Sequence, residues 1–253
     1  MTTRFTHVFF DFTNTLVRVR GSVGQIYADV ARRHGLDAPA DAIDASFAAA
    51  IDGIPQPVQP GLTTQAMAAR EHQWWRQVAQ RTLRPFGDFP RFEAFFDEVF
   101  ELFRRAEVWE LLPGVRRTLS ALRAQGRTLG VISDMDARLY DAFDVLELRE
   151  FFAFVCLSFR TGYAKPNRKL YESASARAGV ATSSCVHVGD SITKDVEPAL
   201  AAGMLAIHLN ESQSGAAPVG AQVIQRLDAL PPLLQRLESC APRTALPESD
   251  EPR

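Results

Sequence analysis

Residues 7–16, with the sequence HVFFDFTNTL, constrain what this chain can fold into more than any other stretch. The run Val8-Phe9-Phe10 is continuously apolar rather than alternating, which is typical of a strand buried on both faces of a parallel sheet. The run stops at Asp11, and a small polar turn follows it. Open α/β sheets place their chemistry just past the carboxyl ends of strands, so Asp11 is a candidate functional residue as well as a candidate cap of that turn.

From Pro113 onward the sequence alternates between strand and helix patterns. Short apolar runs predict four more strands, at residues 129–132, 154–157, 186–188 and 205–209. Helical patterns lie around residues 119–122 and at 137–145, 169–178 and 195–202. Three of these helices stop at a glycine, the residue that most readily takes the left-handed conformation past a helix end. The alternation predicts an α/β core, in which a parallel sheet is covered by helices on both faces.

Between the first strand and Pro113 only helical patterns occur. Apolar stripes predict four helices, at residues 23–34, 40–51, 63–83 and 91–105, and a proline-rich surface loop lies at 55–61. Residues 17–108 are therefore expected to form a separate helical lobe. This lobe would be inserted into a core made of residues 1–16 and 109–240.

The composition is that of an ordinary globular protein, with 46% hydrophobic and 23% charged residues among 253. A net charge of -2 gives no basic surface for nucleic acid, and no apolar run approaches the ~20 residues of a membrane span. The first residues show no secretion-signal pattern, and three scattered cysteines form neither a disulfide framework nor a zinc motif. We expect a cytoplasmic monomer or homodimer without nucleic-acid or membrane partners. Residues 223–237 predict a last amphipathic helix interrupted by Pro231-Pro232, and residues 241–253 a disordered polar tail.

Two polar side chains beyond the first strand suit an anionic ligand. Ser133 ends the second apolar run before a helix, where a hydroxyl and free main-chain N–H groups bind phosphate well, although serine there also caps helices. Lys165 precedes the next helix, in the sequence YAKPN. The chain has 28 basic residues but only three lysines, at positions 165, 169 and 194. This favours a role for a compact cation at Lys165 over a solvated loop lysine.

A third signal is the segment HVGDSITKD, which places Asp190 just past a strand and Asp195 five residues later. Acids at the start of a helix are stabilised by its dipole, which is the simpler explanation of this pair. With Asp11 nearby, the two carboxylates also make a hard oxygen site suited to Mg²⁺. Together these residues support attack by Asp11 on a phosphoryl group. Mg²⁺ and Lys165 would offset the charge of that group, and Ser133 would help to hold its oxygens.

These motifs together resemble those of the haloacid dehalogenase-like hydrolase superfamily, over nearly the whole chain. The matching segments are DFTNTL at 11–16, VISD at 131–134, AKP at 164–166 and HVGDSITKD at 187–195. The stretches LVRVRG, EHQWW and SDMDARL are similar to one group within the superfamily, and the helical lobe resembles its small α-helical cap of class C1. The resemblance implies a Rossmann-like core and a hydrolase that forms an aspartyl-phosphate with a small phosphorylated substrate. It also implies Mg²⁺ bound by Asp11, the main-chain carbonyl of Thr13, Asp190 and Asp195.

Two residues depart from the superfamily's pattern. Its phosphatases carry a second aspartate two residues after the nucleophile, as general acid and base, and here that position holds Thr13. A threonine hydroxyl titrates far too high to relay protons at neutral pH. Since such help is worth about 10²–10⁴-fold, we expect a slow phosphatase. Asp134 stands where many relatives have asparagine, and a carboxylate there weakens the binding of a phosphate dianion unless it points away. A third difference is milder. Asn14 stands at a position where the superfamily usually has glycine, and asparagine also tolerates the left-handed region of backbone conformation.

Two other functions fit parts of this pattern. A haloacid dehalogenase uses the aspartate nucleophile without a second acid and without a metal, but its relatives lack the pair that Asp190 and Asp195 form here. A binding or regulatory protein on a weakly active or inactive scaffold is consistent with Thr13. Phosphonoacetaldehyde hydrolase chemistry requires a lysine from the cap, and all three lysines lie in the expected core. We interpret His187 and His208, both in strand patterns, as core histidines rather than ligands.

Overall fold

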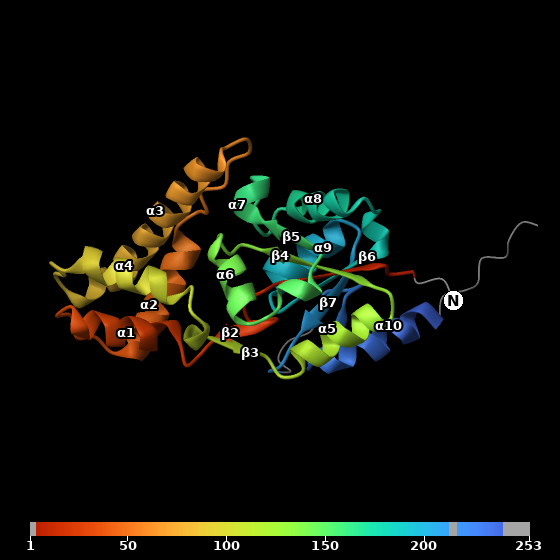
Figure 1. Cartoon of the computed structure of the whole chain (residues 1–253), viewed down its shortest axis with the longest axis horizontal. Helices are drawn as coiled ribbons and strands as arrows, with labels where there is room; N and C mark the ends of the chain where they lie inside the picture. The colour runs from red at the N-terminus through yellow and green to blue at the C-terminus, as the bar shows by residue number, and fades with distance from the viewer. Residues whose placement is uncertain (1–3, 213–216, 240–253) are drawn as a thin grey trace, which may run out of the picture.

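The centre of the molecule is a six-stranded sheet in which every neighbouring pair of strands is parallel. The structure, a computed structural model, describes residues 4–212 and 217–239. In spatial order the strands are β5 (Phe154–Leu157), β4 (Thr128–Ser133), β1 (His7–Phe10), β6 (Cys185–Gly189), β7 (Leu205–Leu209) and β8 (Gln222–Ile224). The predicted α/β fold is confirmed, and β1 lies inside the sheet (Figure 1).

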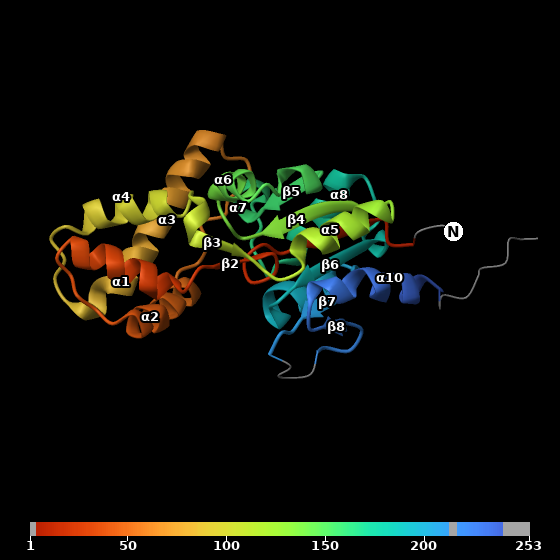
Figure 2. The same ribbon diagram turned by 60° about the horizontal axis from the view of Figure 1, so that its bottom comes forward.

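Helices cover both faces of this sheet, as strands that are apolar throughout require. One face carries α8 (Arg168–Ala178) and α9 (Glu197–Ala201), above the sheet in Figure 1. The other carries α5 (Val115–Ala124), α6 (Arg138–Val145) and α10 (Leu230–Ser239). α5 and α10 lie side by side (Figures 1 and 2). The predicted helix ends at Gly126, Gly179 and Gly203 are confirmed, since their φ angles are 78°, 70° and 84°.

Strand β1 is anchored by side chains that point alternately to the two faces. Val8 and Phe10 belong to the hydrophobic cluster of α5, α6 and α10, whereas Phe9 belongs to that of α8 and α9. All three side chains are fully buried. Burial of a side chain of this size stabilises the fold by about 1.5–3 kcal/mol. The strand therefore holds the residue that follows it, Asp11, in a fixed position.

Four helices form a lobe that stands apart from the sheet, at the left of Figure 1. They are α1 (Val23–Arg33), α2 (Ala40–Gly53), α3 (Thr64–Leu83) and α4 (Phe92–Leu102), each within a few residues of its predicted bounds. Two begin at side-chain caps, because Ser22 Oγ accepts the N–H of Gln25 and Thr63 Oγ1 accepts that of Ala66. The lobe has a hydrophobic core of its own. Its limits as a domain, residues 17–108, stay a prediction.

A two-stranded antiparallel sheet joins this helical lobe to the core, and the sequence patterns missed it. β2 (Val17–Val19) pairs with β3 (Trp109–Leu111), so the chain enters and leaves the lobe at one place. Strands of three residues are too short to show a periodic pattern. The pair lies between the lobe and the core in both views (Figures 1 and 2).

Two predicted helices differ from the structure. The segment 223–237 is not one helix, because β8 first extends the sheet beside β7 and α10 starts only at Leu230. Pro231 and Pro232 do not interrupt α10, since they lie in its first turn, where no main-chain N–H is needed. The segment 195–202 begins earlier than predicted, with the π-helical turn Ile192–Val196 that precedes α9. The tail predicted at 241–253 lies outside the described residues.

The remaining elements are short. The helix α7 (Ser158–Thr161) follows β5 directly, and 3₁₀ turns occur at Arg84–Phe86, Ala106–Val108, Arg149–Phe151, Thr182–Ser184 and Leu227–Ala229. Cys156 and Cys185 are buried free thiols, and Cys240 is not among the described residues. Within residues 4–212 and 217–239, no helix combines the length and the apolar character needed to cross a membrane.

Candidate active site

The order of the strands explains why residues far apart in the sequence meet at one place. β1 lies between β4 and β6, so the carboxyl ends of these three strands are neighbours. One polar residue stands at each end: Asp11 follows β1, Ser133 ends β4, and Asp190 follows β6. All the predicted site residues line a single cavity of about 460 Å³, namely Asp11, Thr13, Ser133, Lys165, Asp190 and Asp195.

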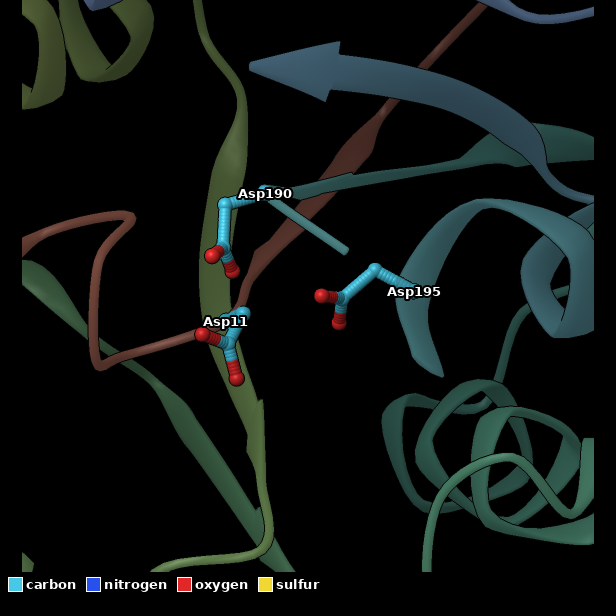
Figure 3. A group of neighbouring side chains, drawn as sticks. All are labelled: Asp11, Asp190 and Asp195. Carbon is cyan, nitrogen blue, oxygen red and sulfur yellow. The ribbon is translucent and has the colours of Figure 1, made fainter. Parts of the chain in front are cut away.

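Three carboxylates are grouped around one space at the end of this cavity (Figure 3). Asp11, Asp190 and Asp195 each offer one oxygen, and these oxygens lie within 4.8 Å of one another. Asp11 and Asp195 are almost wholly buried, with 7% and 2% of their surface exposed, and Asp190 is half-buried. Three hard oxygen donors this close together are a donor set for a divalent cation such as Mg²⁺.

The position of Asp195 depends on the unusual turn that carries it. In the π-helical turn Ile192–Val196, the N–H groups of Asp195 and Val196 both donate to the main-chain oxygen of Ser191, at 2.8 and 3.1 Å. Single π-helical turns recur at functional sites. This one packs Asp195 against Gly189, where an added Cβ atom would lie 2.2 Å from Asp195 Cγ. Only glycine fits at position 189, so packing as well as chemistry requires the glycine of the HVGD sequence.

Lys165 is the cation of the site. Its ammonium group contacts the carboxylate of Asp11 and lies 2.6 Å from Oδ1 of Asp195, and its side chain is only 3% exposed. Burial alone would lower the pKa of Lys165, but the charges of Asp11 and Asp195 raise it well above its ordinary value. The ammonium group is therefore charged at neutral pH.

The charges of the site do not balance, because three carboxylates face one ammonium group. Burial raises the pKa of Asp11 to about 8, against the attraction of Lys165 and with the repulsion of Asp195 and Asp190. Burial and the charge of Asp195 also raise the pKa of Asp190. Burial acts on Asp195 in the same direction, but Lys165 and His187 outweigh it and lower its pKa. A divalent cation would neutralise the excess negative charge, so the residues present fit Mg²⁺.

Two histidines that we interpreted as core residues hold the acidic groups in place. His187, in β6, is fully buried, and its Nε2 lies 2.9 Å from Oδ1 of Asp195. Burial lowers the pKa of His187, so its ring is neutral and donates the Nε2 hydrogen to the carboxylate. His208, in β7, donates from Nε2 to the main-chain oxygen of Asp190, at 3.0 Å. Both are core residues, as interpreted, and both also fix the acidic loop.

Asp134, the carboxylate expected to oppose phosphate binding, is engaged with the loop of Lys165. Its Oδ1 accepts the main-chain N–H of Lys165 at 3.0 Å, and burial raises its pKa. It nevertheless lines the cavity together with Ser133, whose Oγ accepts the N–H of Met135. Gln56, which no sequence pattern singled out, donates from Nε2 to the main-chain oxygen of Asp134 at 3.3 Å. Through this contact the proline-rich loop of the helical lobe reaches the site.

The turn after Asp11 carries two of the residues that depart from the superfamily's pattern, Thr13 and Asn14. Asn14 has a φ of 61°, so it takes the left-handed conformation that its place at a usual glycine predicts. Its side chain lies close enough to Asp190 to oppose the rise in the pKa of that carboxyl group. Thr13 is half-buried and lines the cavity. The turn therefore presents a hydroxyl and an amide, and no carboxylate beyond Asp11.

Comparison with known proteins agrees with this arrangement. A sequence model described as haloacid dehalogenase-like hydrolase matches residues 5–203. Among curated proteins, the chain is 33% identical over 202 residues to haloacid dehalogenase-like hydrolase domain-containing protein 3 of Bos taurus, covering 77% of this chain and 78% of that protein. This is the group that the stretches LVRVRG, EHQWW and SDMDARL indicate.

Solved structures share the fold. The putative HAD-hydrolase YfnB from Bacillus subtilis, determined with bound magnesium, has a TM-score of 0.71 and 18% identity, over 92% of this chain and 99% of its own. A 2-haloacid dehalogenase from Pseudomonas syringae pv. Tomato DC3000 has a TM-score of 0.63 and 27% identity, also over 92% of this chain and 99% of its own. The matched region therefore includes both the sheet and the helical lobe.

Proposed function

Because the chain belongs to the haloacid dehalogenase-like hydrolase family, we propose that it is a Mg²⁺-dependent phosphatase that cleaves a small phosphorylated metabolite through an aspartyl-phosphate intermediate. The observation that carries the proposal is the group of three carboxylates around Asp11, whose charge Lys165 balances only in part. In this proposal the helical lobe, residues 17–108, is the cap over the active site.

The carboxylates of Asp11, Asp190 and Asp195 would hold the metal ion. By resemblance to the family, the main-chain carbonyl of Thr13 is a further ligand. Bound there, Mg²⁺ supplies positive charge that offsets the repulsion between the nucleophile and an anionic substrate. The magnesium bound by the Bacillus subtilis hydrolase is consistent with this choice of ion.

Asp11 is the nucleophile of the first step. One of its oxygens forms a bond to phosphorus while the bond from phosphorus to the leaving-group oxygen breaks, and the leaving group takes that electron pair. Lys165 and Ser133 bind the phosphoryl oxygens and stabilise the charge of the transition state. Burial raises the pKa of Asp11 to about 8 even beside Lys165, so the charge of a bound divalent cation would be needed to keep Asp11 ionised at neutral pH.

The second step releases phosphate. A water molecule attacks phosphorus, the bond to Asp11 breaks, and the carboxylate is restored. In phosphatases of this family an aspartate two residues after the nucleophile protonates the leaving group and then deprotonates this water, and Thr13 does neither at neutral pH. Both protons must be exchanged with solvent. The proposed reaction is therefore slow and favours leaving groups that need little protonation.

Two alternatives have some support. The 27% identity to the dehalogenase from Pseudomonas syringae favours an enzyme in which Asp11 attacks carbon and a halide leaves. Asp190 argues against that chemistry, because a third carboxylate beside the nucleophile serves a metal and repels a departing anion. A catalytically weak or inactive binding or regulatory protein is consistent with Thr13.

The test is turnover on a panel of phosphate monoesters and 2-haloacids, each with Mg²⁺ and with a chelator. We expect the wild type to release phosphate only with Mg²⁺. The nearly isosteric Asp11→Asn variant should lose this turnover while it still unfolds cooperatively, and the surface variant Asp29→Asn should keep it. Halide release without metal would instead support the dehalogenase. If a folded protein that binds Mg²⁺ hydrolysed neither the phosphate monoesters nor the 2-haloacids, that result would support the binding or regulatory function.

A further inference from the structure

Beyond its acidic end, the cavity is walled by rings from the helical lobe. Its lining includes six of them, from α1, α2, α3 and α4: Tyr27, Phe47, Trp74, Trp75, Phe96 and Phe100. Trp109 in β3 lines it as well, so all three tryptophans of the chain border this one cavity. A volume of about 460 Å³ lies within the range of small-molecule sites. Neither a phosphate group nor a metal ion needs a wall of this kind.

The cations that line the cavity are already paired. Lys165 is held by the carboxylates of the site. Arg138 forms an ion pair with Asp136 at 2.6 Å, and both side chains are buried. Lys194 is half-exposed and lies 3.7 Å from Asp52. Among the lining residues that the structure describes, no buried cation is left unpaired for a second anionic group of a ligand.

The Arg138 guanidinium belongs to the wall rather than to a binding site for anions. Its central carbon lies 4.1 Å from the ring centre of Phe100 and 5.0 Å from that of Trp75. Its positive charge interacts with the carboxylate of Asp136 and with the faces of these rings. The wall that it supports is therefore apolar and close to neutral.

Trp75 adds to this apolar wall. Its ring is stacked on that of Phe47, with an interplanar angle of 12°. The indole N–H is buried, and among the described residues it has no hydrogen-bond partner. Because this N–H is shielded from solvent, Trp75 contributes its ring rather than a polar atom to the wall of the cavity.

We propose that this cavity receives an uncharged, apolar group of ring size. Given the proposed function, on which this step rests, that group is the leaving group of a phosphate monoester whose phosphoryl group lies at Asp11. A ring here buries apolar surface against the aromatic wall. A leaving group rich in hydroxyls, such as glycerol or a sugar, would lose hydrogen bonds to water and find few partners on this wall.

Binding tests the proposal without turnover, because every tryptophan of the chain reports on the cavity. Benzylphosphonate and methylphosphonate carry the same uncleavable head group, and each is titrated with Mg²⁺ while tryptophan emission is followed with excitation at about 295 nm. We expect benzylphosphonate to bind at least about tenfold more tightly, from burial of its ring. Equal affinities for the two phosphonates would overturn the proposal.

A matched pair of variants assigns the preference to the cavity. Phe47→Ala removes a lining ring and should reduce the advantage of benzylphosphonate at least about threefold. Phe92→Ala removes an equally half-buried ring of the same lobe that lies outside the cavity, and it should leave the advantage unchanged. If Phe47→Ala does not unfold cooperatively, Phe47→Leu replaces it. An unchanged advantage in the folded Phe47 variant would contradict the proposal.

Hydrolysis separates this inference from the proposed function. Benzyl phosphate and glycerol 3-phosphate both release poorly acidic alcohols, so Thr13 limits both alike. We expect kcat/KM at least about tenfold higher for benzyl phosphate. Hydrolysis of both at equal rates would overturn the inference and keep the phosphatase. Binding of benzyl alcohol by a protein that hydrolyses no phosphate would uphold the apolar site and overturn the phosphatase.

Discussion

Thr13 decides how fast the proposed reaction runs. It lines the cavity two residues after the nucleophile, on the turn that also carries Asn14. Its hydroxyl can donate and accept a hydrogen bond, but it cannot exchange a proton with substrate near pH 7. The rest of the site holds the proposed nucleophile, a cation and three carboxylates that could bind a metal ion. The missing function is therefore confined to one side chain.

Thr13→Asp should restore proton transfer. We expect kcat on alkyl phosphates to rise at least about tenfold, the lower part of the range for general acid–base catalysis, with a smaller gain on aryl phosphates. Thr13→Asn, which has the shape of the aspartate without its proton chemistry, should give no such gain. A folded, Mg²⁺-binding Thr13→Asp protein that stays silent on a broad phosphate panel would favour the binding or regulatory function.

Metal affinity should depend on Asp190 more than on Asp195. Oδ1 of Asp195 already contacts Lys165 and His187, and its Oδ2 accepts the N–H of Ser191 at 3.2 Å. Asp190 is half-buried and has fewer such contacts, so its oxygens are freer to bind an ion directly. Calorimetric titration of Mg²⁺ into Asp190→Asn and Asp195→Asn measures the difference. Full affinity in both variants would mean that the metal site lies elsewhere.

The sequence predicts the reactive residues better than the residues that support them. Asp11 and Asp190 follow strands that are recognisable from their apolar runs, so their meeting at one sheet edge could be inferred. His187 and His208 lie in similar runs, but which oxygen each contacts depends on how β6 and β7 pair. Gln56 is a loop residue 78 positions from its partner Asp134, and no local pattern encodes that contact.

At the scale of elements, α3 carries an acid that links the helical lobe to the core. Glu71 is only 6% exposed, and its carboxylate lies near the main chain of Ala137 and the charge of Asp136. Burial and the nearby charge of Asp136 raise the pKa of Glu71 to about 7. In the unfolded chain its pKa is near 4.5, so folding favours the protonated form of this group.

Stability should therefore fall as the pH rises from about 5 to about 8. Ionisation of Glu71 costs the folded state on the order of 2–3 kcal/mol above its raised pKa of about 7, and nothing below 4.5. Glu71→Gln, which keeps the size and polarity of the side chain without its charge, should raise the free energy of unfolding in urea at pH 8 and leave it nearly unchanged at pH 5. Glu101→Gln, at an exposed acid of α4, is the control. An equal effect of Glu71→Gln at both pH values would contradict this account.

Long elements were predicted more reliably than short ones. The five predicted strands and the longer helices have apolar patterns, because their burial requires apolar residues at regular spacing. Such a pattern can be recognised in the local sequence. β2 and β3 have three residues each, and β8 was read as the start of a helix because Val223 and Ile224 continue the apolar spacing of α10. In β8 the pairing with β7 outweighs that spacing.

At the scale of the whole molecule, the candidate active site is formed by two parts of the structure, the α/β core and the helical lobe. The sheet edge supplies the charged end of the cavity, and the helical lobe supplies its aromatic wall. The antiparallel pair β2–β3 connects the core to the lobe. Its paired residues Val19 and Trp109 both line the cavity. In the proposed function, the α/β core therefore carries out the chemistry and the lobe selects the ligand.

The most direct test of the central claim is the melting temperature with Mg²⁺ and beryllofluoride, which mimics a phosphoryl group on an aspartate. At a ligand concentration ~100 times Kd, binding stabilises the folded state by about 2.7 kcal/mol, or at least about 5 °C for a chain of this size. We predict that rise for the wild type, and none for Asp11→Asn. No rise in the wild type, or an equal rise in both proteins, would contradict Asp11 as the phosphorylated nucleophile.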